Sequence, residues 1–298
     1  MELLRTTDGG VFVDCTLGTG GHSERILRDH PTARVIGIDR DPEAVAVAEG
    51  RLASFGSRFR AVHTDYRNIE GWKGALEGHE PNGILADLGM STLQLRARRG
   101  FSFQDGDSLD MRMDPTGGET AGDLINGASE RTLAATFREY GEERHARRIA
   151  AAVVRRRIRA PIEDAATLAA LVEEVVPKPR HPARRRMHPA TRVFQALRIR
   201  VNRELEGLGD FLLGAFDLLA TGGRFVVIAY HSLEDRIVKN AFRDLAGRCT
   251  CPPGLPVCAC GAEERMTILT RRPLRPGKAE VEANASARSA RLRAGEKR

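Results

Sequence analysis

Short apolar runs alternate with helical patterns over the first hundred residues. Apolar runs of strand length end at polar residues, and amphipathic helical segments follow them. The predicted strands lie at 11–13, 34–38, 59–63 and 84–86, and the predicted helices at 23–28 and from Pro42 onward. Strands that alternate with helices predict a parallel sheet with helices on both faces.

The pattern changes after residue 105. From 106 to 188 it is helical and polar, without a convincing strand. Apolar residues recur at helical spacing between Ile149 and Ile158, and a second helix is predicted over 167–176, before Pro177. The stretch 177–187, rich in proline and arginine, looks like a connector.

Strand character returns near the end of the chain. A helix is predicted over 191–205, a central strand over 224–230 and a further strand over 266–269. The predicted architecture is therefore one α/β sheet domain, residues 1–105 and 189–298, interrupted by a helical insert at 106–188. The polar segment after Gly277 is expected to be a partly mobile tail.

Composition excludes several classes of protein. The chain has 298 residues, 41% hydrophobic and 29% charged, as in a soluble globular protein. No run approaches the ~20 apolar residues that span a bilayer, and MELLRTTDGG lacks the apolar core of a signal peptide. Four of the five cysteines lie between Cys249 and Cys260, which is not a disulfide framework spread through a secreted fold. A cytoplasmic protein is expected.

Positive charge is concentrated in one stretch. The net charge is +7, yet residues 144–203 hold 16 basic and four acidic residues. Such a stretch favours a polyanionic partner, although solvated helix faces explain the charge equally well. Of the 47 basic residues 42 are arginine, a bias that a GC-rich genome also produces.

The segment VDCTLGTGGH, residues 13–22, predicts a strand, a glycine turn and a helix start. Its glycines follow G-x-G-G, and Ser23 stands where a dinucleotide fingerprint needs a third glycine. Asp39, at the end of the second strand, is placed to accept hydrogen bonds from ribose hydroxyls. This combination suits an adenosyl ligand such as S-adenosylmethionine. A nucleotide-dependent oxidoreductase and an RNA-binding factor with a vestigial site are the alternatives.

Two later strand ends should face the same crevice. Tyr66 follows the third strand, where its ring would either lie beside an adenine or pack in the core. Asp87 ends the fourth strand, as a ligand contact or as a turn acid.

Long strings in this chain resemble a known family. DCTLGTGGHSERIL, GIDRDPEAV, ILADLGMSTLQL, RGFSFQDGDSLDMRMDP, YGEERHARRIA, HPATRVFQALRIRVN and GGRFVVIAYHSLEDRIVK occur in order. Together they resemble the bacterial 16S rRNA (cytosine-N4) methyltransferases, the RsmH/MraW family. The resemblance implies a class I methyltransferase fold with a helical insert that recognises RNA. It also implies methyl transfer from S-adenosylmethionine to N4 of a cytidine in the decoding region of the small ribosomal subunit.

The resemblance assigns cofactor contacts by position. They are Gly20, Gly21, His22, Asp39, Tyr66, Asp87 and Gln94. The family's SSPQL string is STLQL here, at residues 91–95, so a proline is lost beside Gln94.

Methyl transfer from a sulfonium mainly requires alignment of nucleophile, methyl group and leaving sulfur. Many amino methyltransferases place an acid or amide before Pro-Pro-aromatic after the fourth strand. Here only the acid, Asp87, is kept, so no catalytic base is assigned. Methylation at C5 of cytosine would need a cysteine beside the base. Cys15, under the glycine turn, is more typical of a small core residue.

A target base inside folded RNA must be splayed out and stacked. Phe101 and Phe103 are candidates for stacking, with a core role as the alternative. His231 and Ser232 could line the base pocket, or start a helix with Ser232 as its cap. Arg192 and the arginines at 184–186 are candidate phosphate contacts.

The cysteine cluster is a separate feature. Cys249-x-Cys251-x6-Cys258-x-Cys260 lies in a loop rich in proline and glycine. Structural zinc and free or oxidisable thiols are both open, because C-x-C pairs are tighter than the usual zinc spacing. The cluster is expected to be structural, and no metal is expected in catalysis. A homodimer is left open.

Overall fold

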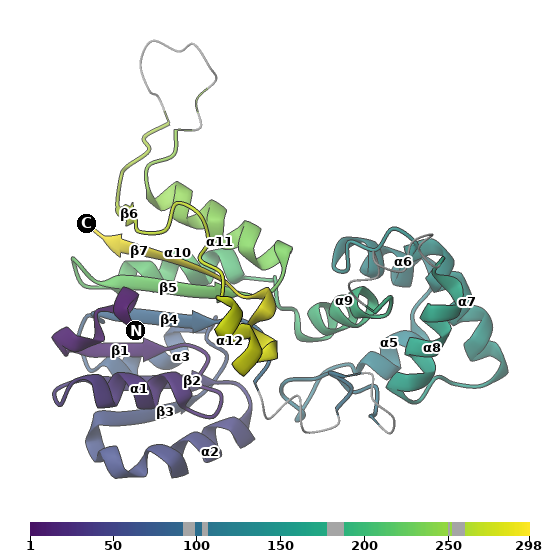
Figure 1. The fold of residues 1–298 in the computed structure, drawn as a ribbon, viewed down its shortest axis with the longest axis horizontal. Coiled ribbons are helices and arrows are strands. Elements are labelled where there is room, and N and C mark those ends of the chain that lie inside the picture. The colour runs from purple at the N-terminus through teal and green to yellow at the C-terminus, as the bar shows by residue number, and fades with distance from the viewer. Residues whose placement is uncertain (92–98, 103–106, 178–187, 250, 252–259) are drawn as a thin grey trace. The chain divides into compact units, whose positions relative to one another are not determined.

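The computed structural model describes residues 1–91, 99–102, 107–177, 188–249, 251 and 260–298. They form two compact units, which we call the sheet unit and the helical unit (Figure 1). The sheet unit is Met1–Gly89 with Leu205–Arg298, and the helical unit is Met90–Glu204.

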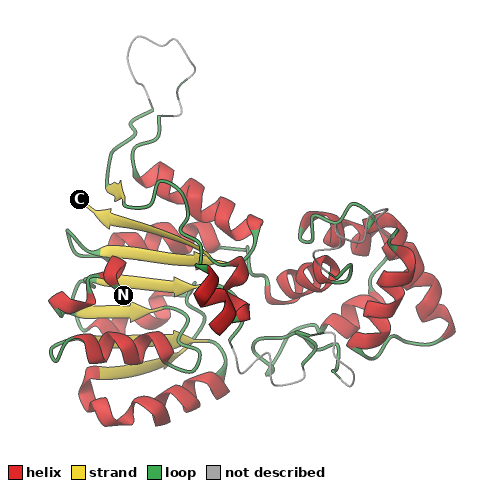
Figure 2. Ribbon diagram, in the orientation of Figure 1, coloured by secondary structure: helices red, strands yellow, loops and turns green. Residues whose placement is uncertain are grey.

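One seven-stranded sheet runs through the sheet unit (Figure 2). Its order is β3-β2-β1-β4-β5-β7-β6, with β1 to β5 parallel and β7 antiparallel to both neighbours. The strands are β1 (Val11–Asp14), β2 (Arg34–Asp39), β3 (Phe59–His63), β4 (Gly83–Asp87), β5 (Arg224–Ala229), β6 (Met266–Ile268) and β7 (Arg291–Lys297). The strands predicted from the sequence are confirmed, and the order reverses at β1 and β4.

Helices cover both faces of this sheet, because alternate residues of each central strand point to opposite sides. The helices are α1 (Gly21–Asp29), α2 (Pro42–Leu52), α3 (Ile69–Lys73), α10 (Leu208–Leu218), α11 (Ser232–Leu245) and α12 (Lys278–Ala283). Val13 and Phe225 pack with α3, α10 and α11 on one face. Phe12 and Val226 pack with α1 and α2 on the other. Short 3-10 turns lie at Glu2–Leu4, Thr6–Asp8, Ala53–Arg58, Gly74–Leu76 and Ala285–Ser289.

The helical unit has its own core. Its helices are α5 (Ala121–Gly127), α6 (Glu130–Glu139), α7 (Ala146–Arg159), α8 (Ala165–Val175) and α9 (Thr191–Asn202). Three of these helices begin at an N-cap residue that the local sequence supplies. The side chains of Thr120, Ser129 and Asp164 cap α5, α6 and α8. Apolar residues of all five helices form one buried cluster. The predicted all-helical character is therefore confirmed for the described residues.

The unit boundaries differ from the predicted insert at 106–188. The helical unit begins at Met90 and ends at Glu204, so it includes α9, which the sequence analysis assigned to the sheet domain. The reason is the buried side of α9. Val193, Phe194 and Leu197 pack into the helical cluster rather than against the sheet.

The expectation of a mobile polar tail is wrong. Residues 291–297 form β7, inserted between β5 and β6. The polar composition of this segment does not predict a strand. The structure accommodates it because its charge is paired, with Arg293 donating to Asp235 at 2.7 Å, and because Ala294 is fully buried. Among the described residues, no helix is long and apolar enough to cross a membrane.

Candidate cofactor site

The carboxyl ends of adjacent parallel strands bring the predicted cofactor residues to one edge of the sheet. Asp14 ends β1, Asp39 ends β2 and Asp87 ends β4, and these strands are neighbours in the order β2-β1-β4. In sheets of this kind ligands bind beyond the carboxyl ends, where the strand order reverses.

The turn after β1 requires glycine at position 20. Gly20 is the N-cap of α1 with φ of 79°, a left-handed conformation that side chains rarely adopt. A Cβ atom there would also lie 3.0 Å from Cδ1 of Leu52 on α2. Gly21 follows as the first residue of α1 and is exposed. The N–H of Gly20 closes the turn by donating to the O of Leu17 at 2.8 Å, and α1 then begins at Gly21.

Asp39 fixes this turn to the end of β2. Its Oδ2 accepts the N–H of Gly18 at 2.8 Å, and its Oδ1 accepts the N–H of Asp41 at 2.9 Å. Burial raises the pKa of the carboxyl despite these two bonds. Each carboxylate oxygen accepts more than one hydrogen bond, so capacity remains for two ribose hydroxyls.

His22, in the first turn of α1, and Asp87, at the end of β4, form a pair. Nε2 of His22 lies 3.2 Å from Oδ2 of Asp87, and the side chains are 40% and 24% exposed. The hydrogen bond to Asp87 raises the pKa of the imidazole. The backbone N–H of Asp87 in turn donates to Oγ1 of Thr16 at 2.7 Å. His22 and Asp87, predicted separately, therefore meet in the structure.

Asp14 is the residue that the sequence analysis missed at this edge. It is fully buried, accepts the hydroxyl of Ser23 at 2.8 Å and so holds α1 against β1. Burial raises its pKa, and the negative charge of Asp87 adds to the shift. An acid directly after the buried run VFV was the available signal.

Tyr66 packs against the core of the sheet unit. Its ring meets Phe211 of α10 edge-on, with centroids 4.6 Å apart. Burial raises the pKa of its phenol well above the ordinary value. Of the two roles considered for Tyr66, the structure shows the packing role, and the contact with an adenine stays a prediction.

The end of β5 adds Tyr230 and His231. Burial raises the pKa of the Tyr230 phenol, and the negative charge of Asp87 adds to the shift. The phenol therefore keeps its proton. The ring also lies against Gly89, where a Cβ atom would come within 3.0 Å of Cδ2 of Tyr230.

His231, not Ser232, caps α11. The His231 side chain accepts from the N–H of Glu234, and the Glu234 carboxylate accepts from the N–H of His231 and, at 3.0 Å, of Tyr230. Nε2 of His231 also lies 3.0 Å from Oε1 of Glu234. His231 is buried at 6% exposure. The predicted capping role of Ser232 is thus corrected, since Ser232 is the first residue inside the helix.

The site fits a cationic adenosyl ligand. Asp14 and Asp87 both interact with the His22 imidazole, and the charge of Asp14 also raises the pKa of Asp39. Oδ1 of Asp87 is buried and has no hydrogen-bond partner among the described residues. A buried acceptor without a partner is costly, and a ligand that donates to it would remove that cost.

The predicted substrate residues divide between the two units. Phe101 packs against the helical cluster, and Arg192 of α9 donates to the backbone O of Glu142 at 3.2 Å. His231 and Ser232 belong to the sheet unit. Gln94, Phe103 and the arginines at 184–186 lie outside the described residues.

The strand order with an antiparallel β7, the glycine turn after β1 and the acid after β2 define the class of protein. This is the fold of the class I S-adenosylmethionine-dependent methyltransferases, as the sequence analysis predicted. Within that class, the chain belongs to the MraW methylase family, whose pattern matches residues 1–298.

Three relatives are similar over the whole chain. The protein of Carboxydothermus hydrogenoformans is 48% identical over 100% of this chain and 94% of its own length. That of Anaeromyxobacter sp. (strain K) is 50% identical with the same coverage of both chains. That of Thermomicrobium roseum is 48% identical over 100% of this chain and 90% of its own length. All three are named ribosomal RNA small subunit methyltransferase H.

Proposed function

We propose that this enzyme transfers a methyl group from S-adenosylmethionine to N4 of a cytidine in the decoding region of 16S rRNA. Membership of the family and the names of the relatives support the reaction and the RNA. The single observation that carries the proposal is the acidic carboxyl edge of the sheet beside the glycine turn, with Asp39 and Asp87 on either side of β1.

Asp39 would hold the ribose, and the N–H groups near Gly20 and Gly21 would face the rest of the cofactor. When bound, S-adenosylmethionine supplies a methyl group on a positively charged sulfur that departs as a neutral thioether. The carboxylates of Asp14 and Asp87 favour that positive charge at the edge of the sheet. Gln94 stays a prediction, as does the contact of Tyr66 with adenine.

The amino group of cytosine is a weak nucleophile because its lone pair is delocalised into the ring. The task of the chain is to hold this amine in line with the methyl group, to exclude water and to accept a hydrogen bond from it. Tyr230, which keeps its proton, offers a donor near Asp87. We assign no catalytic base.

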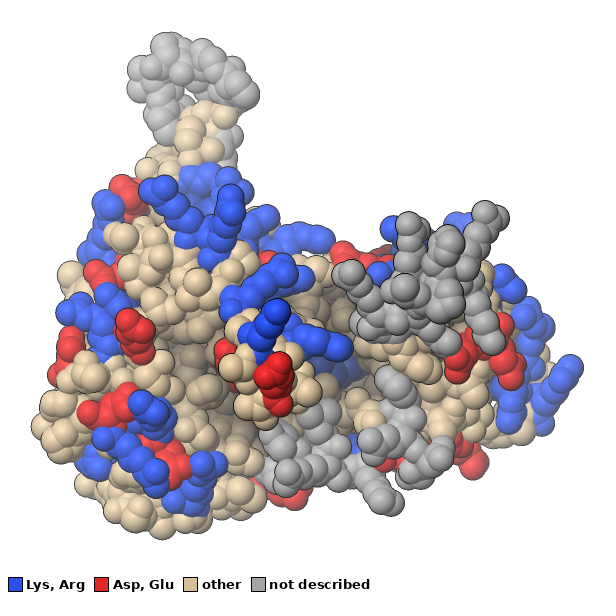
Figure 3. Space-filling model, viewed as in Figure 1, with Lys and Arg blue, Asp and Glu red and all other residues tan. Residues whose placement is uncertain are grey.

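The helical unit is the proposed RNA-recognition part. Exposed arginines lie along α7 and just before its first residue, and Figure 3 shows blue side chains gathered over this helix. They are Arg144, Arg147, Arg148, Arg155 and Arg159. Other arginines of the basic stretch are structural. Arg157 donates to the backbone O of Ile125 at 2.7 Å, and Arg198 binds Glu204 through two bonds of 2.8 Å.

The test uses small ribosomal subunits from a strain that lacks the modification. With labelled S-adenosylmethionine, the label should enter 16S rRNA and be recovered as N4-methylated cytidine after digestion to nucleosides. Subunits from the parent strain, in which the target cytidine is already methylated, are the control and should take up little label. Label found only as 5-methylcytidine, or none at all, would overturn the proposal.

The part of the proposal that concerns RNA has its own variant. Arg147→Ala with Arg148→Ala should weaken RNA binding. The slope of the logarithm of the binding constant against the logarithm of the salt concentration should become shallower by about two, one for each lost phosphate contact. Affinity for S-adenosylhomocysteine should stay unchanged. Stacking of the target base on Phe101, a phosphate contact of Arg192, a base pocket lined by His231 and Ser232, and a cytoplasmic location remain predictions that accompany this proposal. A homodimer stays open.

A further inference from the structure

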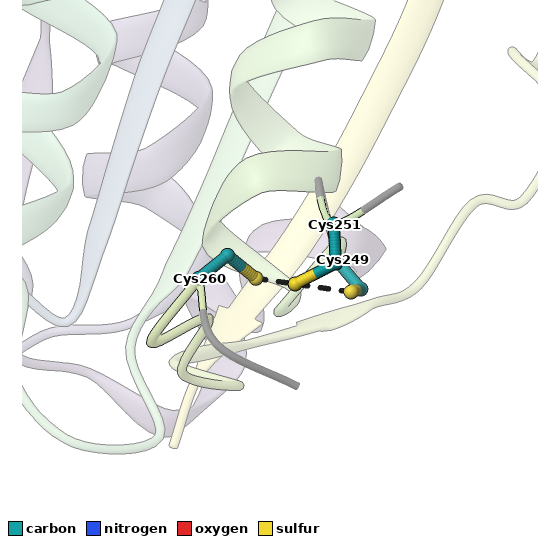
Figure 4. A group of neighbouring side chains, drawn as sticks. All are labelled: Cys249, Cys251 and Cys260. Atoms are coloured by element: carbon teal, nitrogen blue, oxygen red, sulfur yellow. Dashed lines mark hydrogen bonds between the residues drawn. The ribbon is translucent and has the colours of Figure 1, made fainter. Parts of the chain in front are cut away.

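Three cysteine thiols meet in the connection between α11 and β6, away from the cofactor residues. Cys249 and Cys260 are exposed and Cys251 is half-buried. Their Sγ atoms all lie within 4.8 Å of one another, and Figure 4 shows the three sulfur atoms gathered together. The fifth cysteine of the chain, Cys15, is buried at the end of β1 and takes no part.

The sulfur spacing distinguishes between two chemistries. Sγ of Cys249 lies 3.8 Å from Sγ of Cys260. A disulfide requires about 2.05 Å between the sulfurs. Tetrahedral zinc with Zn–S bonds of about 2.3 Å separates its sulfur ligands by about 3.8 Å, the edge of that tetrahedron. The observed distance excludes a formed disulfide and equals the edge of the zinc tetrahedron. Two protonated thiols in contact have a similar separation, so the case for a metal rests on the third sulfur at the same point.

The backbone around the cluster is fixed. Ala246 and Glu264 form an antiparallel bridge, and the N–H of Arg265 donates to the O of Leu245 at 2.8 Å. Gly247 has φ of 76°, and a Cβ atom there would lie 3.1 Å from the backbone N of Glu264. Cys249 lies shortly after Gly247 in the chain, and Cys260 lies shortly before Glu264. The paired stems therefore bring these two thiols close to each other.

We propose that Cys249, Cys251 and Cys260 bind one Zn²⁺ ion that closes this loop. Zinc is borderline soft and prefers thiolates, and three thiols gathered at one point exceed what one disulfide uses. Each ligating thiol loses its proton to solvent, so binding releases up to three protons and weakens as the pH falls. The role is structural, because these residues lie beyond α11 and not at the carboxyl edge of the sheet.

Metal content tests the proposal directly. The full chain, purified without chelator, should hold about one zinc per chain by mass spectrometry. Cys249→Ser with Cys260→Ser should lose this zinc, whereas Cys15→Ala, which also removes a thiol, should keep it. Zinc-edge X-ray absorption should give three or four sulfur ligands at about 2.3 Å.

Several outcomes would overturn the proposal. They are a chain without zinc that also fails to bind added zinc or cobalt, a Cys249–Cys260 disulfide in the purified protein, and zinc retained by the double variant. Two or fewer sulfur ligands at the metal would do the same. If the double variant does not fold, the wild-type chain can be stripped with a chelator, checked for its helix content and reloaded. Failure to take up about one equivalent then counts against the site.

Discussion

Removal of the Asp39 carboxylate gives the most direct test of the cofactor site. In Asp39→Ala the N–H groups of Gly18 and Asp41 lose acceptors at 2.8 and 2.9 Å. Hydrogen bonds to a charged group contribute about 1.5–3 kcal/mol each, but water reaches this half-buried position. We therefore expect unfolding free energy to fall by about 1–3 kcal/mol.

Cofactor affinity should fall by more than stability does. Two ribose hydroxyls bound to a carboxylate are worth about 2–4 kcal/mol net, which corresponds to roughly 30- to 700-fold weaker binding. Asp39→Asn should lie between wild type and Asp39→Ala. Its amide keeps one acceptor oxygen but turns an NH₂ group toward a backbone donor.

Isothermal titration with S-adenosylhomocysteine measures the affinity, and urea unfolding measures the stability. Glu49→Ala, which removes an exposed acid from α2, changes the net charge equally and should bind the ligand within about twofold of wild type. An Asp39→Ala variant that folds normally and binds within threefold of wild type would refute the assignment of Asp39.

Three further perturbations test other parts of the structure. Asp87→Asn should lower the pKa of His22, which NMR titration measures. In the wild type, the stability that protonated His22 adds is present below about pH 6.5 and is lost as the pH rises through its raised folded pKa. A variant whose stability depends on pH as the wild type's does would contradict the pair. Arg198→Ala leaves Glu204, 8% exposed, without its two-bond partner and should destabilise the helical unit by up to about 3 kcal/mol in urea; a loss under 0.5 kcal/mol would be too small for a buried pair. Ala294→Asp places a charge at a fully buried position of β7 and should cost about 3 kcal/mol or more by thermal unfolding, whereas a tolerated Asp would mean that β7 is not in the sheet.

Much of the sheet could be predicted because its central strands are buried on both faces. Continuous apolar runs such as 11–13 and 225–229 have few other places in a soluble fold. The element β7 was missed because the segment RLRAGEK has no apolar run. Its place in the sheet depends on the pairing of Arg293 with Asp235, 58 residues away in the chain, which local patterning does not contain.

The candidate site was predicted in its parts but not in its connections. Gly20, Asp39 and Asp87 could be placed together because parallel strands bring their carboxyl ends to one edge, a rule that sequence can use; their cofactor contacts stay predictions. The pairing of His22 with Asp87, the buried Asp14 and the cap formed by His231 required coordinates. Each depends on side-chain direction and on distances of about 3 Å between residues from different elements.

The sequence by itself determined the fold class, the family resemblance and the composition of the glycine turn, because apolar periodicity and local turn chemistry act over a few residues. Tertiary structure decided where the helical unit begins and ends, which arginines are structural, and that the polar C-terminal segment is a strand. These depend on which surfaces are buried against one another, and burial is a property of the packed chain. The cysteines show both sides: their spacing left zinc and free thiols open, and only the tertiary structure shows that three sulfurs lie within 4.8 Å of one another.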